Sequence, residues 1–107
     1  PTQRKAINMQ ESSVLELVLF TTKPGREARV AELREQVREA LRDFEGFIGL
    51  RGLAAVEGAP VYADLVEWTS HEQALAAARA FSERDLRFQP YLREIQEVIF
   101  MGHFSPA

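Results

Sequence analysis

The pattern of apolar residues changes twice from that of a strand to that of a helix, and this order limits the fold more than any other feature. Residues 14–21 are aliphatic and β-branched almost throughout, and the turn at Lys23-Pro24-Gly25 ends regular structure. From Arg26 to about Gly46, apolar residues recur at three- and four-residue steps, which predicts an amphipathic helix. The first unit is therefore a strand followed by a helix.

The two sides of this helix differ in chemistry. Its apolar stripe consists of Val30, Leu33, Val37, Ala40, Leu41 and Phe44. Its charged side consists of Arg29, Glu32, Arg34, Glu35, Arg38, Glu39 and Arg42. Charge pairs along one helix contribute only about 0.2–0.5 kcal/mol each, so we interpret the charged side as a solvated surface.

A hairpin is predicted after the helix. Residues 47–57 and 61–68 are strand-like runs joined by a turn that contains glycine and proline. Gly49 and Gly52 weaken the first run, and glycines inside a strand indicate a bulge or the close approach of another group.

The second unit repeats the order of the first. Residues 69–81 are predicted to form an alanine-rich helix, because Ser70 and Gln73 have the spacing of a capping box. Residues 83–96 favour one or two short helical turns broken at their proline. Residues 97–104 form the last predicted strand.

The element order predicts the fold class. Strand, helix, strand, strand, helix, strand is the βαββαβ order of α+β ferredoxin-like folds. Such a chain forms a four-stranded antiparallel sheet with its helices on one face. We place the domain at residues 14–104, preceded by a loose polar arm at residues 1–13 and followed by a tail at residues 105–107.

Both faces of the predicted sheet carry apolar residues. In the first strand Val14, Val18 and Phe20 share a face with Glu16, opposite Leu15, Leu17 and Leu19, and in the last strand Val98, Phe100 and Phe104 lie opposite Ile99 and Met101. Helices cover only one face, and the identical sheet of a second chain would cover the other. We therefore expect a homodimer.

Composition excludes several classes of protein. The 13 basic and 16 acidic residues are interleaved, which leaves no phosphate-binding surface and no nucleic-acid partner. The absence of cysteine excludes disulfides, thiolate nucleophiles, Cys-ligated zinc and iron–sulfur clusters, and we expect no metal. No apolar run has the length of a signal peptide or a membrane span, so we expect a cytoplasmic protein without a membrane partner.

Three segments in succession carry a family resemblance. They are residues 22–27 (TKPGRE) after the first strand, 44–49 (FEGFIG) entering the second and 67–75 (EWTSHEQAL) leaving the third. Together they resemble the antibiotic-biosynthesis-monooxygenase domain and its quinol-oxygenase and heme-oxygenase relatives, over roughly residues 14–104. The resemblance implies a dimeric α/β barrel with a pocket in each subunit between the sheet and the helices.

The resemblance also implies a chemistry. Enzymes of this family often oxidise electron-rich phenols, anthrones or quinols with O2 and need no metal or flavin, because the deprotonated substrate itself supplies electrons to oxygen. The expected function is thus a cofactor-independent monooxygenase acting on an aromatic or quinol-like small molecule. Such an enzyme needs a base, a shaped apolar cavity and donors for a developing oxyanion.

Trp68 is the first candidate for the site. It occupies the family's tryptophan position at the end of the third strand, where it can stack on a flat ring, and Tyr62, Asp64 and Val66 share its strand face. The alternative is that Trp68 is a core or rim aromatic that joins strand to helix. The candidate substrate-binding residues are Tyr62, Tyr91, Arg51 and Phe88.

Glu16 and His103 are, with Trp68, the candidate catalytic residues. Glu16 has only apolar neighbours in its strand, so its carboxylate must be paired, hydrogen-bonded, shifted in pKa or placed in a wet cavity. Arg51 is a candidate counter-charge, and a salt bridge at the dimer interface is the structural alternative. His103 and His71 can accept a proton near neutral pH, although a structural role for His103 and an exposed position for His71 are the simpler interpretations.

Heme oxygenation is disfavoured. The heme-degrading branch carries an asparagine in the first strand and a histidine late in the second helix or just after it. This chain has Leu17 and Val18 in the first strand, and Phe81, Phe88 and Tyr91 where that histidine would lie. The missing asparagine also departs from the anthrone-oxygenase pattern.

Two hypotheses of different classes therefore remain. The chain is either a cofactor-independent monooxygenase or a non-catalytic dimeric α/β barrel that binds a small molecule or serves in a stress response. An enzyme needs an open cavity beside Trp68 with a titratable group reaching into it, whereas a filled core would favour the second hypothesis.

Overall fold

Four strands form one antiparallel sheet in the computed structural model, which describes residues 13–107. The strands are β1 (Val14–Thr22), β2 (Phe47–Ala54), β3 (Tyr62–Trp68) and β4 (Ile95–Phe104). They lie in the order β2-β3-β1-β4, so the first and last strands of the chain are neighbours. This arrangement confirms the predicted α+β ferredoxin-like fold.

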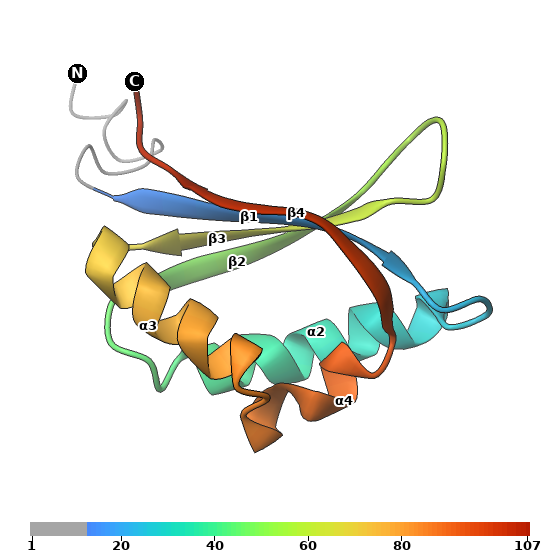
Figure 1. Ribbon diagram of the computed structural model, residues 1–107, viewed down its shortest axis with the longest axis horizontal. Helices are drawn as coiled ribbons and strands as arrows, with labels where there is room; N and C mark the ends of the chain where they lie inside the picture. The colour runs from blue at the N-terminus through green and yellow to red at the C-terminus, as the bar shows by residue number, and fades with distance from the viewer. Residues whose placement is uncertain (1–12) are drawn as a thin grey trace.

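The helical elements lie together on one side of the sheet (Figure 1). They are α2 (Glu27–Leu41), α3 (His71–Ser82), the 3-10 turn η1 (Leu86–Phe88) and α4 (Gln89–Leu92). The side chain of Ser70 accepts a hydrogen bond from the backbone N–H of Gln73, at 3.2 Å, which confirms the predicted start of the second helix. None of the helices among residues 13–107 has the length and apolar character that a membrane span requires.

The first helix ends earlier than its periodicity predicts. Beyond Leu41 the backbone N–H groups of Asp43 and Phe44 bond to carbonyls three residues back, which tightens the chain into turns. Gly46 then adopts a φ of 86°, a conformation that favours glycine, and leads the chain into β2. These turns place Phe44 against Phe88 of η1, with ring centroids 5.8 Å apart.

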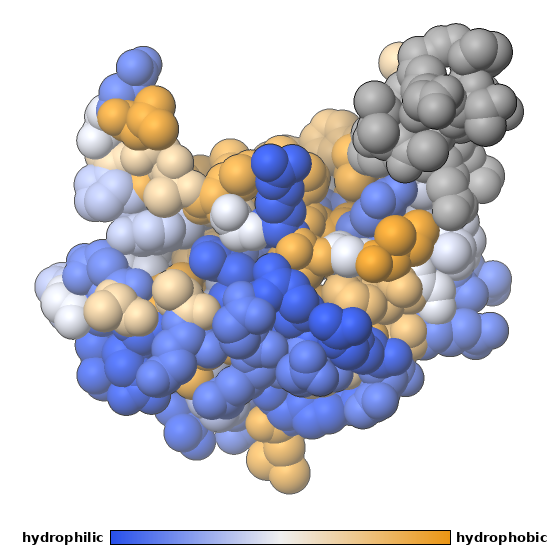
Figure 2. Space-filling model, turned by 180° about the vertical axis from the view of Figure 1, so that it is seen from behind, coloured by the Kyte–Doolittle hydropathy of each residue, from blue (hydrophilic) through white to orange (hydrophobic). Residues whose placement is uncertain are grey.

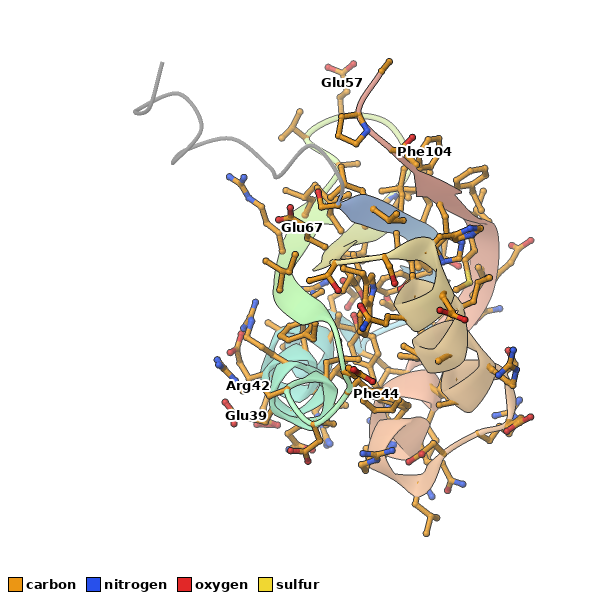
Figure 3. All side chains as sticks on the ribbon, turned by 90° about the vertical axis from the view of Figure 1, so that its left-hand side faces the viewer. Glu39, Arg42, Phe44, Glu57, Glu67 and Phe104 are labelled. Atoms are coloured by element: carbon orange, nitrogen blue, oxygen red, sulfur yellow. The ribbon has the colours of Figure 1, made fainter. Side chains whose placement is uncertain are left out.

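The core lies between the sheet and the helices. Its buried residues come from one face of the sheet and from the facing stripes of the helices, and include Phe20, Val30, Leu33, Val37, Val66, Trp68, Ala74, Ala77 and Phe88. The end-on view in Figure 3 shows side chains filling this layer, while Glu39 and Arg42 point outward from α2. The predicted arm lies outside the described residues except for Ser13, which is buried.

A bulge in β4 corrects one predicted side-chain direction. Strict alternation puts Val98 on the same face as Phe100 and Phe104. The pairing with β1 shifts by one residue between Leu19 and Phe20, which face Phe100 and Val98 respectively. The extra residue turns Val98 toward the helices, where it lines an internal cavity with Met101.

Candidate functional site

An apolar cavity of about 90 Å³ lies between the sheet and the helices. Its wall is mostly aliphatic and aromatic, and three polar side chains contribute to it: Glu16 from β1, Asp64 from β3 and Tyr91 from α4. Because water is scarce in such a site, each of these polar groups must find a partner or change its protonation.

Glu16 is paired with His103 across the β1–β4 ladder. These residues are direct neighbours in the register, and the Nε2 atom of His103 lies 3.1 Å from Oε2 of Glu16. Burial raises the pKa of Glu16 above its ordinary value of 4.5, whereas the interactions with His103 and Trp68 oppose the rise. A carboxylate with these properties is suited to take up a proton inside the cavity.

Trp68 adjoins this pair. Its indole is fully buried and packs edge-on against Phe47, with ring centroids 5.7 Å apart. The indole N–H is close enough to Glu16 to favour its charged form, yet no described residue accepts a hydrogen bond from it in good geometry. The site therefore holds a buried donor beside the buried carboxylate.

A second polar cluster, formed by Arg34, Asp64 and Tyr91, borders the cavity. The Tyr91 hydroxyl donates to Oδ2 of Asp64 at 2.7 Å, and Nε of Arg34 donates to Oδ1 at 2.8 Å. Burial raises the pKa of Asp64, while both of these hydrogen bonds oppose the rise. Burial and the nearby Asp64 carboxylate also raise the pKa of Tyr91, so its phenol remains a hydrogen-bond donor.

The interpretation of the charged side of the first helix was wrong for two arginines. The Arg34 side chain is only 13% exposed because it passes against Gly52 of β2 to reach Asp64. Arg38 donates through Nη2 to the backbone oxygen of Leu50 at 2.9 Å. The long aliphatic parts of these side chains cover apolar surface while their charged ends find partners, which a helix pattern alone does not reveal.

The two glycines of β2 have different roles, and Gly52 is the one that leaves room for Arg34. Gly52 lies opposite Asp64 in the register, and a Cβ atom on it would lie 2.4 Å from Cζ of Arg34. Between Phe47 and Gly49 the pairing with β3 shifts by one residue, so Gly49 is the last residue of a bulge. The predicted close approach and the predicted bulge are both confirmed, at Gly52 and Gly49 respectively.

Substitution of Gly52 by alanine is expected to displace Arg34 from Asp64. The new methyl group would occupy the place of the guanidinium, and the loss of a partnered buried charge should lower the free energy of unfolding by about 1–3 kcal/mol. Urea unfolding measures this loss. Gly49→Ala is the matched control, because a Cβ atom there meets nothing within 4 Å. Equal losses in both variants would contradict the role of Gly52.

The predicted site residues other than Glu16 and Tyr91 lie outside the wall of this cavity, Trp68 and His103 included. Tyr62 packs on Phe20, with ring centroids 6.0 Å apart, and Phe88 is a core residue that stacks on Phe81 at 4.3 Å. Arg51 faces the opposite side of the sheet from Glu16, so the partner of Glu16 is His103 and the predicted pairing with Arg51 is wrong. Of the predicted substrate-binding residues, Tyr91 alone lines the cavity.

A wider, open hollow of about 300 Å³ adjoins the cavity. The two spaces share Phe81, Leu92, Ile95 and Val98, which come from α3, α4 and β4. A small molecule can thus approach between the end of α3 and the start of β4. Among residues 13–107, no group of three or more His, Cys, Asp or Glu side chains is arranged to hold a metal ion.

Comparison with solved structures identifies the fold. A protein assigned as an antibiotic biosynthesis monooxygenase from Bordetella bronchiseptica matches with a TM-score of 0.78 and 18% identity, over 90% of this chain and 98% of that one. SnoaB, a cofactor-independent oxygenase from Streptomyces nogalater, matches with a TM-score of 0.71 and 17% identity, over 90% and 94% of the two chains.

A heme-degrading protein has the same fold. MhuD from Mycobacterium tuberculosis, whose structure holds two hemes in its active site, matches with a TM-score of 0.67 and 19% identity, over 87% of this chain and 94% of that one. No family model and no curated protein sequence matches this chain. The fold is therefore that of the antibiotic biosynthesis monooxygenases, as the sequence resemblance predicted, and at these identities the likeness does not fix a reaction.

Proposed function

We propose that this chain is a cofactor-independent monooxygenase that oxidises a small aromatic or quinol-like molecule with O2. The observation that supports this function is the apolar cavity with the Glu16 carboxylate in its wall and His103 behind that carboxylate. A non-catalytic binding protein would have no need of a buried carboxylate, which costs free energy to ionise there. A cytoplasmic location and the absence of a cofactor stay predictions.

The proposed reaction begins with proton transfer to Glu16. Loss of a proton from an activated C–H or O–H group of the substrate leaves an electron-rich anion, which gives one electron to O2. The two radicals combine to form a C–O bond, the peroxide anion takes a proton from water, and the resulting hydroperoxide loses water to leave a carbonyl group. One oxygen atom thus enters the substrate and the other leaves as water, and the substrate supplies all the electrons. Glu16 takes up the substrate proton, while the buried Trp68 N–H beside it is a donor that can stabilise negative charge.

Cavity size limits the proposed substrate to a single ring. A cavity of about 150 Å³ accommodates benzene, and the cavity here is about 90 Å³ with an open hollow beside it. A catechol or quinol ring therefore fits only if it extends partly into the hollow, and a three-ring anthrone exceeds the cavity by far more. We therefore expect single-ring quinols and catechols to be better substrates than anthrones.

Filling the cavity tests this function. Oxygen uptake by the protein would be measured with quinols, catechols and anthrones, and Val18→Phe, which puts a ring into the cavity wall, should abolish the uptake. Leu75→Phe is the control, because Leu75 is exposed on α3. The single tryptophan reports binding separately through its fluorescence. Fluorescence changes without oxygen uptake would favour the non-catalytic binding protein and contradict the proposed reaction.

We further propose a homodimer through the outer face of the sheet. Exposed apolar side chains on that face include Phe100 and Phe104, which are 41% and 47% exposed. Leu15, Leu17 and Leu19 of β1 share the face. In Figure 2, hydrophobic residues gather in the upper part of the molecule, over the sheet, while hydrophilic residues cover most of the lower half. A monomeric mass by light scattering at micromolar concentration would contradict the dimer.

A further inference from the structure

Three side chains connect the buried cavity with the surface at the start of α3. Glu16 and His103 are in contact, and their side chains are 9% and 15% exposed. The ring of His103 lies beside that of His71, with centroids 5.2 Å apart and planes inclined by 55°. His71 is the first residue of α3 and is exposed. Side chains from β1, β4 and α3 thus form a continuous polar line through an otherwise apolar region.

The outer end of this line opens into a surface hollow. The hollow has a volume of about 210 Å³ and is lined by Val14, His71, His103, Phe104 and Ser105. Water in it can reach both imidazole rings, and one water molecule is enough to bridge two rings at this separation.

His103 is the described neighbour of Glu16 that can carry a proton onward. The Trp68 N–H is a donor only and cannot accept a proton. Asp64 also influences Glu16, but its carboxylate oxygens already accept hydrogen bonds from Arg34 and Tyr91. A neutral imidazole, in contrast, accepts a proton on one nitrogen and releases one from the other.

We propose that His103 and His71 form a proton relay between Glu16 and solvent. A proton on the Glu16 carboxyl passes to Nε2 of His103, and the proton on the other nitrogen of that ring leaves to His71 or to water in the hollow. No net charge remains on His103, and Glu16 is restored to its ionised form for the next substrate. The role of this relay in turnover rests on the proposed function, because a base that takes a proton from each substrate molecule must release that proton before the next one.

The relay can be tested without any substrate. After a light-released proton pulse, time-resolved infrared spectroscopy follows the carboxylic C=O band of Glu16, which is identified by its absence in Glu16→Gln. We expect His71→Ala and His103→Gln to slow the rise of this band at least about tenfold. Free imidazole, which can enter the open hollow, should restore the rate in His71→Ala. Glu72→Gln, an exposed change in the same helical turn, is the control and should leave the rate unchanged.

The outcomes separate this inference from the proposed function. Equal rates in the protein and both histidine variants, or no Glu16 band at any pH at which the chain is folded, would overturn the relay. Circular dichroism of each variant shows whether it is folded, and His71 is exposed, so its replacement should not disturb the core. Slowed proton uptake in a protein that consumes no oxygen would retain the relay and remove only the oxygenase.

Discussion

Replacement of Glu16 by glutamine is expected to lower oxygen uptake by roughly 10²–10⁴-fold, the usual contribution of a general base. Glutamine has nearly the same shape and its amide oxygen can still accept a hydrogen bond from His103, so the cavity should keep its form. Substrate binding, measured by Trp68 fluorescence, should change little. A loss of kcat with unchanged affinity would identify Glu16 as the base.

The same substitution is expected to lower activity without lowering the stability of the fold. The pKa of Glu16 is raised in the folded protein, chiefly by burial, so the folded state holds its proton more tightly than the unfolded chain does. The free energy of unfolding therefore falls as pH rises from the ordinary pKa of 4.5 through the raised pKa. Above the raised pKa the full loss of stability caused by the buried, ionised carboxylate is present. At neutral pH, Glu16→Gln should be at least as stable as the natural sequence.

Thermal unfolding from pH 4 to pH 8 measures this effect. The difference in stability between Glu16→Gln and the natural sequence should increase in favour of the variant as pH rises through the raised pKa of Glu16. Asp64 also titrates with a raised pKa, but it is present in both proteins and cancels in the difference. A variant that loses stability at neutral pH while oxygen uptake persists would show that Glu16 is a structural carboxylate held by His103.

The fold could be predicted from the sequence because it depends on periodicity. The apolar steps of α2, the Ser70 cap of α3 and the short runs of the strands are local signals that each indicate one kind of element. Register defects are not local, which is why the bulge in β4 and the direction of Val98 were missed. The end of α2 at Leu41 was also missed, because the following turns keep the apolar spacing of a helix.

The candidate site was predicted only in part. Glu16 was recognisable because a carboxylate among apolar strand residues must be accommodated in some way, but its partner depended on which strand lies beside β1. Arg34 was missed because it lies on the edge of the apolar stripe of α2, where a long side chain can turn either to water or to the sheet. Gly52 was the available signal, because a glycine inside a strand often marks the place where another group approaches the backbone closely.

Replacement of Asp64 by alanine is expected to cost about 3–5 kcal/mol of unfolding free energy, the largest effect on stability among these variants. The change leaves the Arg34 guanidinium and the Tyr91 hydroxyl buried without the carboxylate that accepts from both. Domains of this size are stable by only about 5–15 kcal/mol, so the variant should unfold at much lower urea concentration.

Removing all three side chains of the cluster shows whether Asp64→Ala loses stability through the unpartnered charge of Arg34 or through lost packing. In the triple variant Arg34→Met, Asp64→Leu and Tyr91→Phe, no buried charge or hydroxyl remains without a partner, and such replacements are often neutral or stabilising. We therefore expect the triple variant to regain most of the stability that Asp64→Ala loses. If both variants unfold at the same urea concentration, the Asp64 side chain stabilises the fold through its packing, and the orphaned charge of Arg34 is not the cause.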